Sequence, residues 1–216
     1  MTKVTYASLA LISCVLSTRG QILNGSFENT QGTYVPNSGS FMEVGVGSTA
    51  IPGWKVISYS ISWIPQPNPW QLTTPYGSMF LDLTGSHDNG FYGGISQSIA
   101  TSPSQTYRLS LSLGSQQDQA NLAGPMSVIV NAGASSQPFT LTPSGTGNQW
   151  GTFSFDFIAT SSSTLISIAG TRSGGGAYLG LDNIQVTAVP EPSAFSVLLL
   201  GTMLLFARKR SCPAQP

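Results

Sequence analysis

The central part of this 216-residue sequence contains no cysteine and few positive charges. Both cysteines, Cys14 and Cys212, lie near the ends of the chain. The region between residues 21 and 188 therefore has no disulfide, no thiolate nucleophile and no cysteine metal site. In this region three cations stand against seven carboxylates, so its net charge is minus four. Because so few scattered cations cannot neutralise a phosphate backbone, the composition excludes nucleic acid as a partner.

Histidine is limited to His87, which restricts the catalytic machinery that the chain can build. A Ser-His-Asp triad would have to use Ser86 and Asp88, which are too close to His87 in sequence for the required geometry. A glycosidase needs two carboxylates separated by about 5 Å or by about 6.5 to 9.5 Å, and no motif nominates such a pair. We therefore expect a protein that is not an enzyme.

Sustained helical periodicity is also missing from residues 21–188. Short apolar runs instead alternate with clusters of Gly, Pro, Asn and Ser about every ten residues, a spacing typical of β-sandwiches. In the clearest strand, Leu109, Leu111 and Leu113 fall on one face, and residues 153, 155 and 157 repeat this period with phenylalanine. Further strands are expected over 126–130, 164–169 and 178–186. The pattern predicts one all-β domain, a β-sandwich over residues 21–188.

The first twenty residues have the pattern of a secretory signal peptide. Lys3 precedes an apolar stretch over residues 4–16, and small or polar residues follow up to Gly20. Cleavage after Gly20 would make Gln21 the first residue of the mature protein. An alternative stays open, because residues 11–14 fit a lipobox and would place a lipid on Cys14.

The end of the chain combines three regions of different chemistry: a proline-flanked glutamate, an apolar run over 194–207 and a basic triplet. A helix over the apolar run would be roughly 21 Å long, whereas a hydrocarbon core is roughly 30 Å thick. We expect a short hydrophobic helix that contacts the membrane at least transiently, with the basic triplet on the cytoplasmic side.

This arrangement resembles the PEP-CTERM sorting signal of Gram-negative bacteria, with the segment over 189–210 and a tail over 211–216. The residues that carry the resemblance are Pro190, Glu191, Pro192, Arg208, Lys209 and Arg210. It implies processing by an exosortase-type enzyme and delivery to the cell envelope or surface, where such proteins are linked to exopolysaccharide. The tail, including Cys212, extends past the point where such signals usually stop. The alternative is an ordinary tail helix.

Five blocks of the central region resemble the family known as domain of unknown function 642. They lie at residues 23–28, 51–54, 80–85, 93–97 and 181–184. The resemblance implies a galactose-binding-like jelly roll, association with polysaccharide and no established catalytic machinery. The sequence departs from the family pattern at residues 88–92, which lengthen the loop before Gly93.

Related carbohydrate-binding jelly rolls hold a structural Ca²⁺ between an acidic residue at the first strand and one at the last. The resemblance places Glu28 and Asp182 at the matching positions. Calcium binds to carboxylate and carbonyl oxygens of this kind. The alternative is that Glu28 caps a turn and Asp182 accepts hydrogen bonds from nearby backbone.

Candidate sugar-binding residues lie in a proline-rich segment over residues 63–76. Sugars stack their C–H faces on aromatic rings, and four prolines would stiffen this loop so that Trp70 and Tyr76 face a ligand. Short polar side chains beside them would pair with sugar hydroxyls; these are Gln66, Asn68 and Gln71. Phe91 and Tyr92 complete the aromatic set together with Trp63. For Trp63 and Trp54 we favour the core, whereas Trp70 and Tyr76 are as consistent with packing as with binding.

Two further polar residues call for an interpretation. Gln97 shares a strand face with Ile95 and Ile99, which predicts a buried amide in a structural hydrogen-bond network. Arg108 lies opposite the leucines of its strand, where solvation is more common than ligand binding. The sequence as a whole predicts an exported, envelope-targeted, non-catalytic protein that binds or organises extracellular polysaccharide. The alternatives are a structural matrix protein without sugar binding and, third, a glycoside hydrolase.

Overall fold

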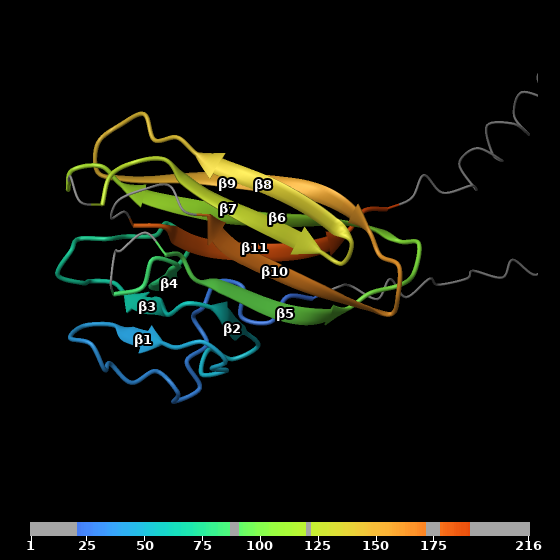
Figure 1. Cartoon of the computed structure of the whole chain (residues 1–216), viewed down its shortest axis with the longest axis horizontal. Coiled ribbons are helices and arrows are strands. Elements are labelled where there is room, and N and C mark those ends of the chain that lie inside the picture. Colours follow the sequence, from blue (N-terminus) through green and yellow to red (C-terminus); the bar gives the residue numbers. More distant parts are fainter. Residues whose placement is uncertain (1–20, 87–90, 120–121, 172–177, 191–216) are drawn as a thin grey trace, which may run out of the picture.

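The computed structural model describes residues 21–86, 91–119, 122–171 and 178–190, which form two packed β-sheets (Figure 1). The predicted signal peptide, His87, and the sorting segment from Glu191 onward lie outside the described residues. The strands are β1 (Met42–Val44), β2 (Lys55–Ser58), β3 (Ile61–Pro65), β4 (Met79–Asp82), β5 (Gly94–Ala100), β6 (Thr106–Gln116), β7 (Met126–Ala132), β8 (Ser135–Leu141), β9 (Asn148–Ile158), β10 (Ser163–Thr171) and β11 (Gly180–Ala188).

All strand pairings in the described chain are antiparallel. One sheet has the order β1-β3-β4-β11-β6-β9 and the other β2-β5-β10-β7-β8. Strands far apart in sequence are therefore neighbours, as where β11 lies between β4 and β6. The prediction of an all-β jelly-roll sandwich is confirmed. The described residues include no helix with the length and apolar character needed to cross a membrane.

The space between the sheets holds the main core, and the predicted strand faces are confirmed there. Leu109, Leu111 and Leu113 of β6 are fully buried. Phe157 of β9 is buried as well, whereas the other two phenylalanines of that strand are partly buried and pack against the edge of the core. Apolar side chains at every second position are what fix the register of these strands.

Trp54 and Trp63 belong to this core, as predicted. Both indoles are almost completely buried. Each N–H group donates to a backbone carbonyl near the start of the domain, Trp54 Nε1 to Asn24 at 3.0 Å and Trp63 Nε1 to Phe27 at 3.2 Å. A buried indole needs such a partner for its N–H group. The two tryptophans thus anchor the N-terminal segment to the sandwich.

The outer face of the six-stranded sheet carries a second, smaller apolar cluster. Its buried members are Phe41, Ile64, Leu72, Phe80, Leu122 and Tyr178, with Trp70 and Trp150 packed against them. Strand alternation explains this placement, because Leu81 points into the main core and its neighbours Phe80 and Asp82 therefore point outward. The segment between β3 and β4 lies over this face.

Candidate functional site

The loop between β3 and β4, residues 66–78, has its own internal hydrogen bonds. Asn68 Nδ2 donates to the carbonyls of Pro65 (3.0 Å) and Leu72 (2.8 Å), and Asn68 Oδ1 accepts from the Leu72 N–H group at 3.0 Å. Gln66 binds the backbone of Thr74 in both directions, at 3.1 and 3.2 Å. These side-chain amides form hydrogen bonds with the loop backbone and hold the loop in one conformation.

Five hydrogen bonds tie this loop to the outer face of the six-stranded sheet. Thr74 Oγ1 donates to Asp182 Oδ2 of β11 at 2.5 Å, and Trp150 Nε1 of β9 donates to the Thr73 carbonyl at 2.7 Å. The other three also join the loop to β9: Asn148 Nδ2 donates to Gln71 O (2.9 Å), Asn148 Oδ1 accepts from the Thr73 N–H group (3.1 Å), and the hydroxyls of Tyr76 and Thr152 lie 3.1 Å apart. The loop therefore covers the outer face of β11 and β9.

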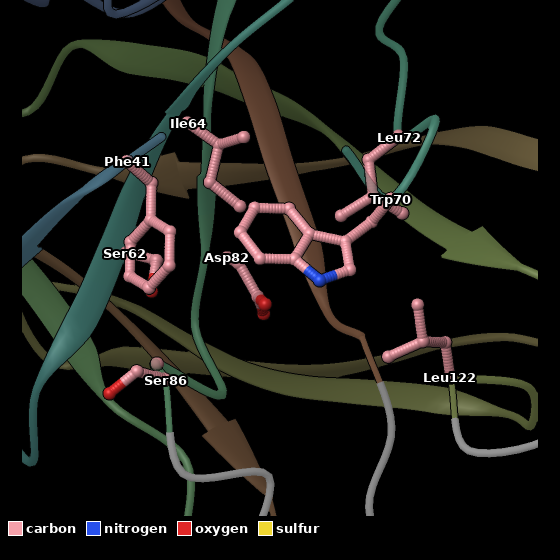
Figure 2. A pocket seen from close by; sticks show the side chains of 9 residues that line it. Phe41, Ser62, Ile64, Trp70, Leu72, Asp82, Ser86 and Leu122 are labelled. Carbon is pink, nitrogen blue, oxygen red and sulfur yellow. The ribbon is translucent and has the colours of Figure 1, made fainter. Parts of the chain in front are cut away.

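A pocket of about 130 Å³ remains between the loop and β3 and β4 (Figure 2). It is lined by Phe41, Ser62, Ile64, Trp70, Leu72, Asp82, Gly85, Ser86 and Leu122. The half-buried indole of Trp70 forms one wall and meets Phe41 edge to face, with ring centroids 5.3 Å apart. The pocket thus has aromatic and aliphatic walls around a small set of polar groups.

Two buried polar side chains line this pocket. Ser62 is 2% exposed, and its hydroxyl has no hydrogen-bond partner in the described part of the chain. Asp82 is 6% exposed, and its Oδ1 accepts from the Thr84 N–H group (2.9 Å), the Thr84 hydroxyl (2.7 Å) and the Leu179 N–H group (3.2 Å). Buried polar groups are almost always satisfied, so the Ser62 hydroxyl is available to a ligand or a water molecule in the pocket.

A buried tyrosine, Tyr178, belongs to the smaller apolar cluster on the same outer face of the sheet. The Tyr178 hydroxyl is fully buried and has no partner among the described residues. Burial raises the pKa of Tyr178 well above its ordinary value, and the charges of Asp82 and Asp182 raise it further. The phenol therefore stays neutral and serves as part of the apolar cluster.

The structure separates the predicted sugar-binding residues. Trp70 lines the pocket, whereas Asn68 is used inside the loop and Gln71 is exposed, with a backbone φ of 55°. Tyr76 is half-buried and packs edge-on against Trp150, with centroids 6.1 Å apart.

The other aromatic candidates lie outside the pocket. Tyr92 is buried in the main core, which corrects its inclusion in an exposed aromatic set. Its side chain points into the space between the two sheets, where it packs beside Gly170. Phe91 is exposed and stacks on Tyr59, with ring centroids 5.2 Å apart.

The two acidic residues of the predicted calcium site face the same region but are held by protein donors. Glu28 accepts from the N–H groups of Ser78 and Met79, both at 2.8 Å, and from the Ser78 hydroxyl at 2.7 Å. Asp182 accepts from Thr74 and from its neighbour's N–H group. Burial raises the pKa of Asp182 to about 7; the hydrogen bonds oppose this rise and the charge of Glu28 adds to it. No group of three or more potential metal-ligating His, Cys, Asp or Glu side chains occurs in the described ranges.

Gln97 and Arg108 both lie where the sequence places them, one buried and the other exposed. Gln97 is buried and binds the backbone of Leu23 twice, accepting from its N–H group at 2.7 Å and donating to its carbonyl at 2.9 Å. Its predicted structural role is confirmed. Arg108 is exposed to solvent, as expected, and it also forms two hydrogen bonds, at 2.7 and 2.8 Å, with the carboxylate of Asp156 directly across the strand pair.

Sequence reasoning missed most of the pocket. Ser62, Asp82, Phe41 and Leu122 come from four separate segments, and only the fold brings them to Trp70. One signal was available for Asp82, because it alternates with Leu81 and Leu83 and must face away from the core. Nothing comparable marks Phe41 or Leu122.

Fold and pocket together define a β-sandwich of the jelly-roll class with one small ligand-sized pocket outside the six-stranded sheet. The chain belongs to the family described as Protein of unknown function (DUF642), whose family model matches residues 20–184. The resemblance inferred from the five sequence blocks is thereby confirmed.

The fold is similar to that of an arabinose-bound α-L-arabinofuranosidase, MgGH51, with a TM-score of 0.51 and 15% identity. That match covers 80% of this chain and 27% of the enzyme, so this chain corresponds to about a quarter of it. At this identity the similarity shows the fold alone. No curated protein matches the chain at a significant level.

Two smaller structures are matched over nearly their full length. The CBM22-1 xylan-binding domain from Paenibacillus barcinonensis has 13% identity and a TM-score of 0.42, covering 82% of this chain and 99% of that domain. TmCBM61 in complex with β-1,4-galactotriose has 14% identity and a TM-score of 0.44, covering 78% and 99%.

Proposed function

We propose that this protein binds carbohydrate through the pocket beside Trp70 and is not an enzyme. The observation that carries the proposal is the buried, unpartnered hydroxyl of Ser62 within an aromatic-walled pocket. A sugar ring presents an apolar C–H face and a rim of hydroxyls, which match the Trp70 indole and the polar groups of Ser62 and Asp82. Sites of this kind combine mostly apolar walls with a few placed polar groups.

The roles of the predicted residues follow from their contacts. Trp70 supplies the stacking surface, and Asn68 is a positioning residue that holds the loop carrying it. Tyr76 keeps the same loop on β9 through Thr152. Gln71 stands outside the pocket lining, where it would reach only a part of the glycan that leaves the pocket.

We also propose that the chain is exported and delivered to the cell envelope of a Gram-negative-type bacterium. The sequence patterns at residues 1–20 and 189–210 support this, and the second pattern points to an exosortase-type enzyme as a partner. At the cell surface, many copies that each bind one sugar weakly would hold polysaccharide firmly by multivalency. The protein would thus organise extracellular polysaccharide.

A calcium ion between Glu28 and Asp182 remains part of the proposal. Two carboxylates that repel each other, one of them fully buried, form a region where a cation would be favoured. A bound ion would join the start of the domain to β11 and, through Thr74, to the loop that carries Trp70. The donors that now satisfy Glu28 would remain compatible, because each carboxylate oxygen has two lone pairs.

The test is binding of the full chain to a panel of neutral and acidic polysaccharides, with Ser62→Ala and Trp70→Ala as variants. Ser62→Ala removes a hydroxyl that has no partner without ligand, so the free energy of unfolding should not fall. The affinity for the glycan should drop about tenfold through loss of one hydrogen bond. Trp70→Ala should lower affinity by at least about tenfold through loss of stacking.

Tyr59→Ala is the matched control, because Tyr59 is an exposed aromatic residue outside the pocket lining. Its affinity should equal that of the unchanged protein. Binding that survives both pocket substitutions would show that sugar is held elsewhere. Absence of binding to every glycan would favour the structural matrix protein, and release of reducing sugar would favour the glycoside hydrolase.

A further inference from the structure

The β3–β4 loop occupies the surface along which an extended glycan would otherwise lie. Its Thr73, Thr74 and Tyr76 contact β9 and β11 across the outer face of the six-stranded sheet. A chain crossing those strands would have to displace the loop and leave the carboxylate of Asp182 without its Thr74 hydrogen bond. The structure therefore leaves the pocket, rather than an open groove, as the accessible part of this face.

The pocket has the size of a single ring. Its volume is about 130 Å³, whereas pockets for drug-sized ligands measure roughly 300 to 1,000 Å³. A cavity of about 150 Å³ is known to hold one benzene ring. The walls are largely apolar, and in Figure 2 the indole of Trp70 lies between Phe41 and Leu122.

The charge of the pocket selects among sugars. Among the described residues that line it, Asp82 is the only charged one. Within the described ranges the basic side chains are Lys55, on the other sheet, and Arg108, which is paired with Asp156. A sugar carboxylate placed beside Asp82 would be repelled, since two like charges in a site of low polarity oppose each other. Sugar hydroxyls, in contrast, can donate to Asp82 and Ser62.

We propose that the pocket receives the terminal residue of a glycan chain and that this residue is a neutral sugar. This inference rests on the proposed carbohydrate binding and specifies its ligand. The remainder of the glycan leaves through the open side of the pocket into solvent, so the protein recognises chain ends and not the interior of a polymer. A surface covered with such a protein would hold a branched glycan through several of its chain ends at once.

The experiment uses the full chain and four neutral polysaccharides, namely xylan, galactan, arabinan and glucan, with polygalacturonate as the acidic probe. Each is offered intact and after random endo-cleavage to about one tenth of its mean length, at equal total mass. Cleavage raises the number of ends about tenfold, so the apparent Kd per unit mass of a bound neutral glycan should fall about tenfold. The free monosaccharide of the same type should compete completely, and polygalacturonate should not bind at either length.

Trp70→Ala, measured in parallel, separates the two proposals. If binding depends on Trp70 but stays constant or weakens on cleavage, the protein recognises chain interiors and the terminal-residue inference is overturned while carbohydrate binding stands. Trp70-dependent binding of polygalacturonate would overturn the preference for a neutral sugar. If none of the five probes binds in either form, both proposals fail together.

Discussion

Asp182 offers a quantitative test of the electrostatics beneath the loop. The carboxylate is fully buried, and burial raises its pKa from the ordinary 3.8 to about 7. Because the folded-state pKa lies above the unfolded one, the folded protein holds this proton more tightly. The associated stability is fully present below about pH 4 and is lost as the pH rises through about 7. The difference between the two pKa values corresponds to about 4 kcal/mol.

The perturbation is Asp182→Asn, which keeps an oxygen acceptor for Thr74 and removes the charge. With a calcium chelator present, the free energy of unfolding of the unchanged protein should fall by up to about 4 kcal/mol more than that of the variant between pH 4 and pH 8. Urea denaturation followed by tryptophan fluorescence at several pH values measures this difference.

Calcium and a surface carboxylate supply the controls. Asp156→Asn should show the opposite sign, because the hydrogen bond from Arg108 lowers the pKa of the exposed Asp156. If calcium binds, adding it should stabilise the unchanged protein most above pH 7, and chelation should lower its Tm by several degrees without affecting Asp182→Asn. Parallel pH curves for the unchanged protein and Asp182→Asn in chelator would refute the reasoning about burial.

Three further substitutions test the framework around the site. Gln97→Ala should cost about 1 to 3 kcal/mol of unfolding free energy, because it leaves both backbone groups of Leu23 without their buried partner; an unchanged urea midpoint would contradict this. Gly77→Ala should lower the Tm, because Gly77 has a φ of 146° and an added Cβ would overlap the Glu28 carboxylate. A Tm equal to that of the unchanged protein would show that the loop can shift at no cost. Arg108→Ala should leave the urea midpoint and the glycan affinity nearly unchanged, because its ion pair is exposed; a loss of affinity would place a ligand on that strand.

The sequence predicted the architecture of the domain because the strand pattern is local information. The alternating leucines of β6 and the phenylalanines of β9 identify both the strands and their buried faces. The two core tryptophans and Gln97 were also placed correctly, since apolar neighbours in the same strands indicated burial. Individual polar contacts were harder, as Arg108 shows, because its partner Asp156 is 48 residues away.

The candidate site was predicted in part. Trp70 was identified from the proline-rich loop, which the structure shows to be held in one shape by Asn68 and Gln66. The adjoining polar residue Gln71 is exposed and lies outside the pocket lining. Residue type and nearness in sequence were therefore weak guides to which side chains share a cavity.

The amino-acid sequence by itself determined the all-β class, the family, the low positive charge and the chemical character of both chain ends. These properties depend on composition, on period-two patterns and on short motifs, all of which are readable along the chain. Only the tertiary structure decided that Ser62 and Asp82 lie beneath Trp70 and that the β3–β4 loop covers the sheet. Pairing between distant strands and the docking of that loop bring these groups together, and no local pattern encodes such long-range contacts.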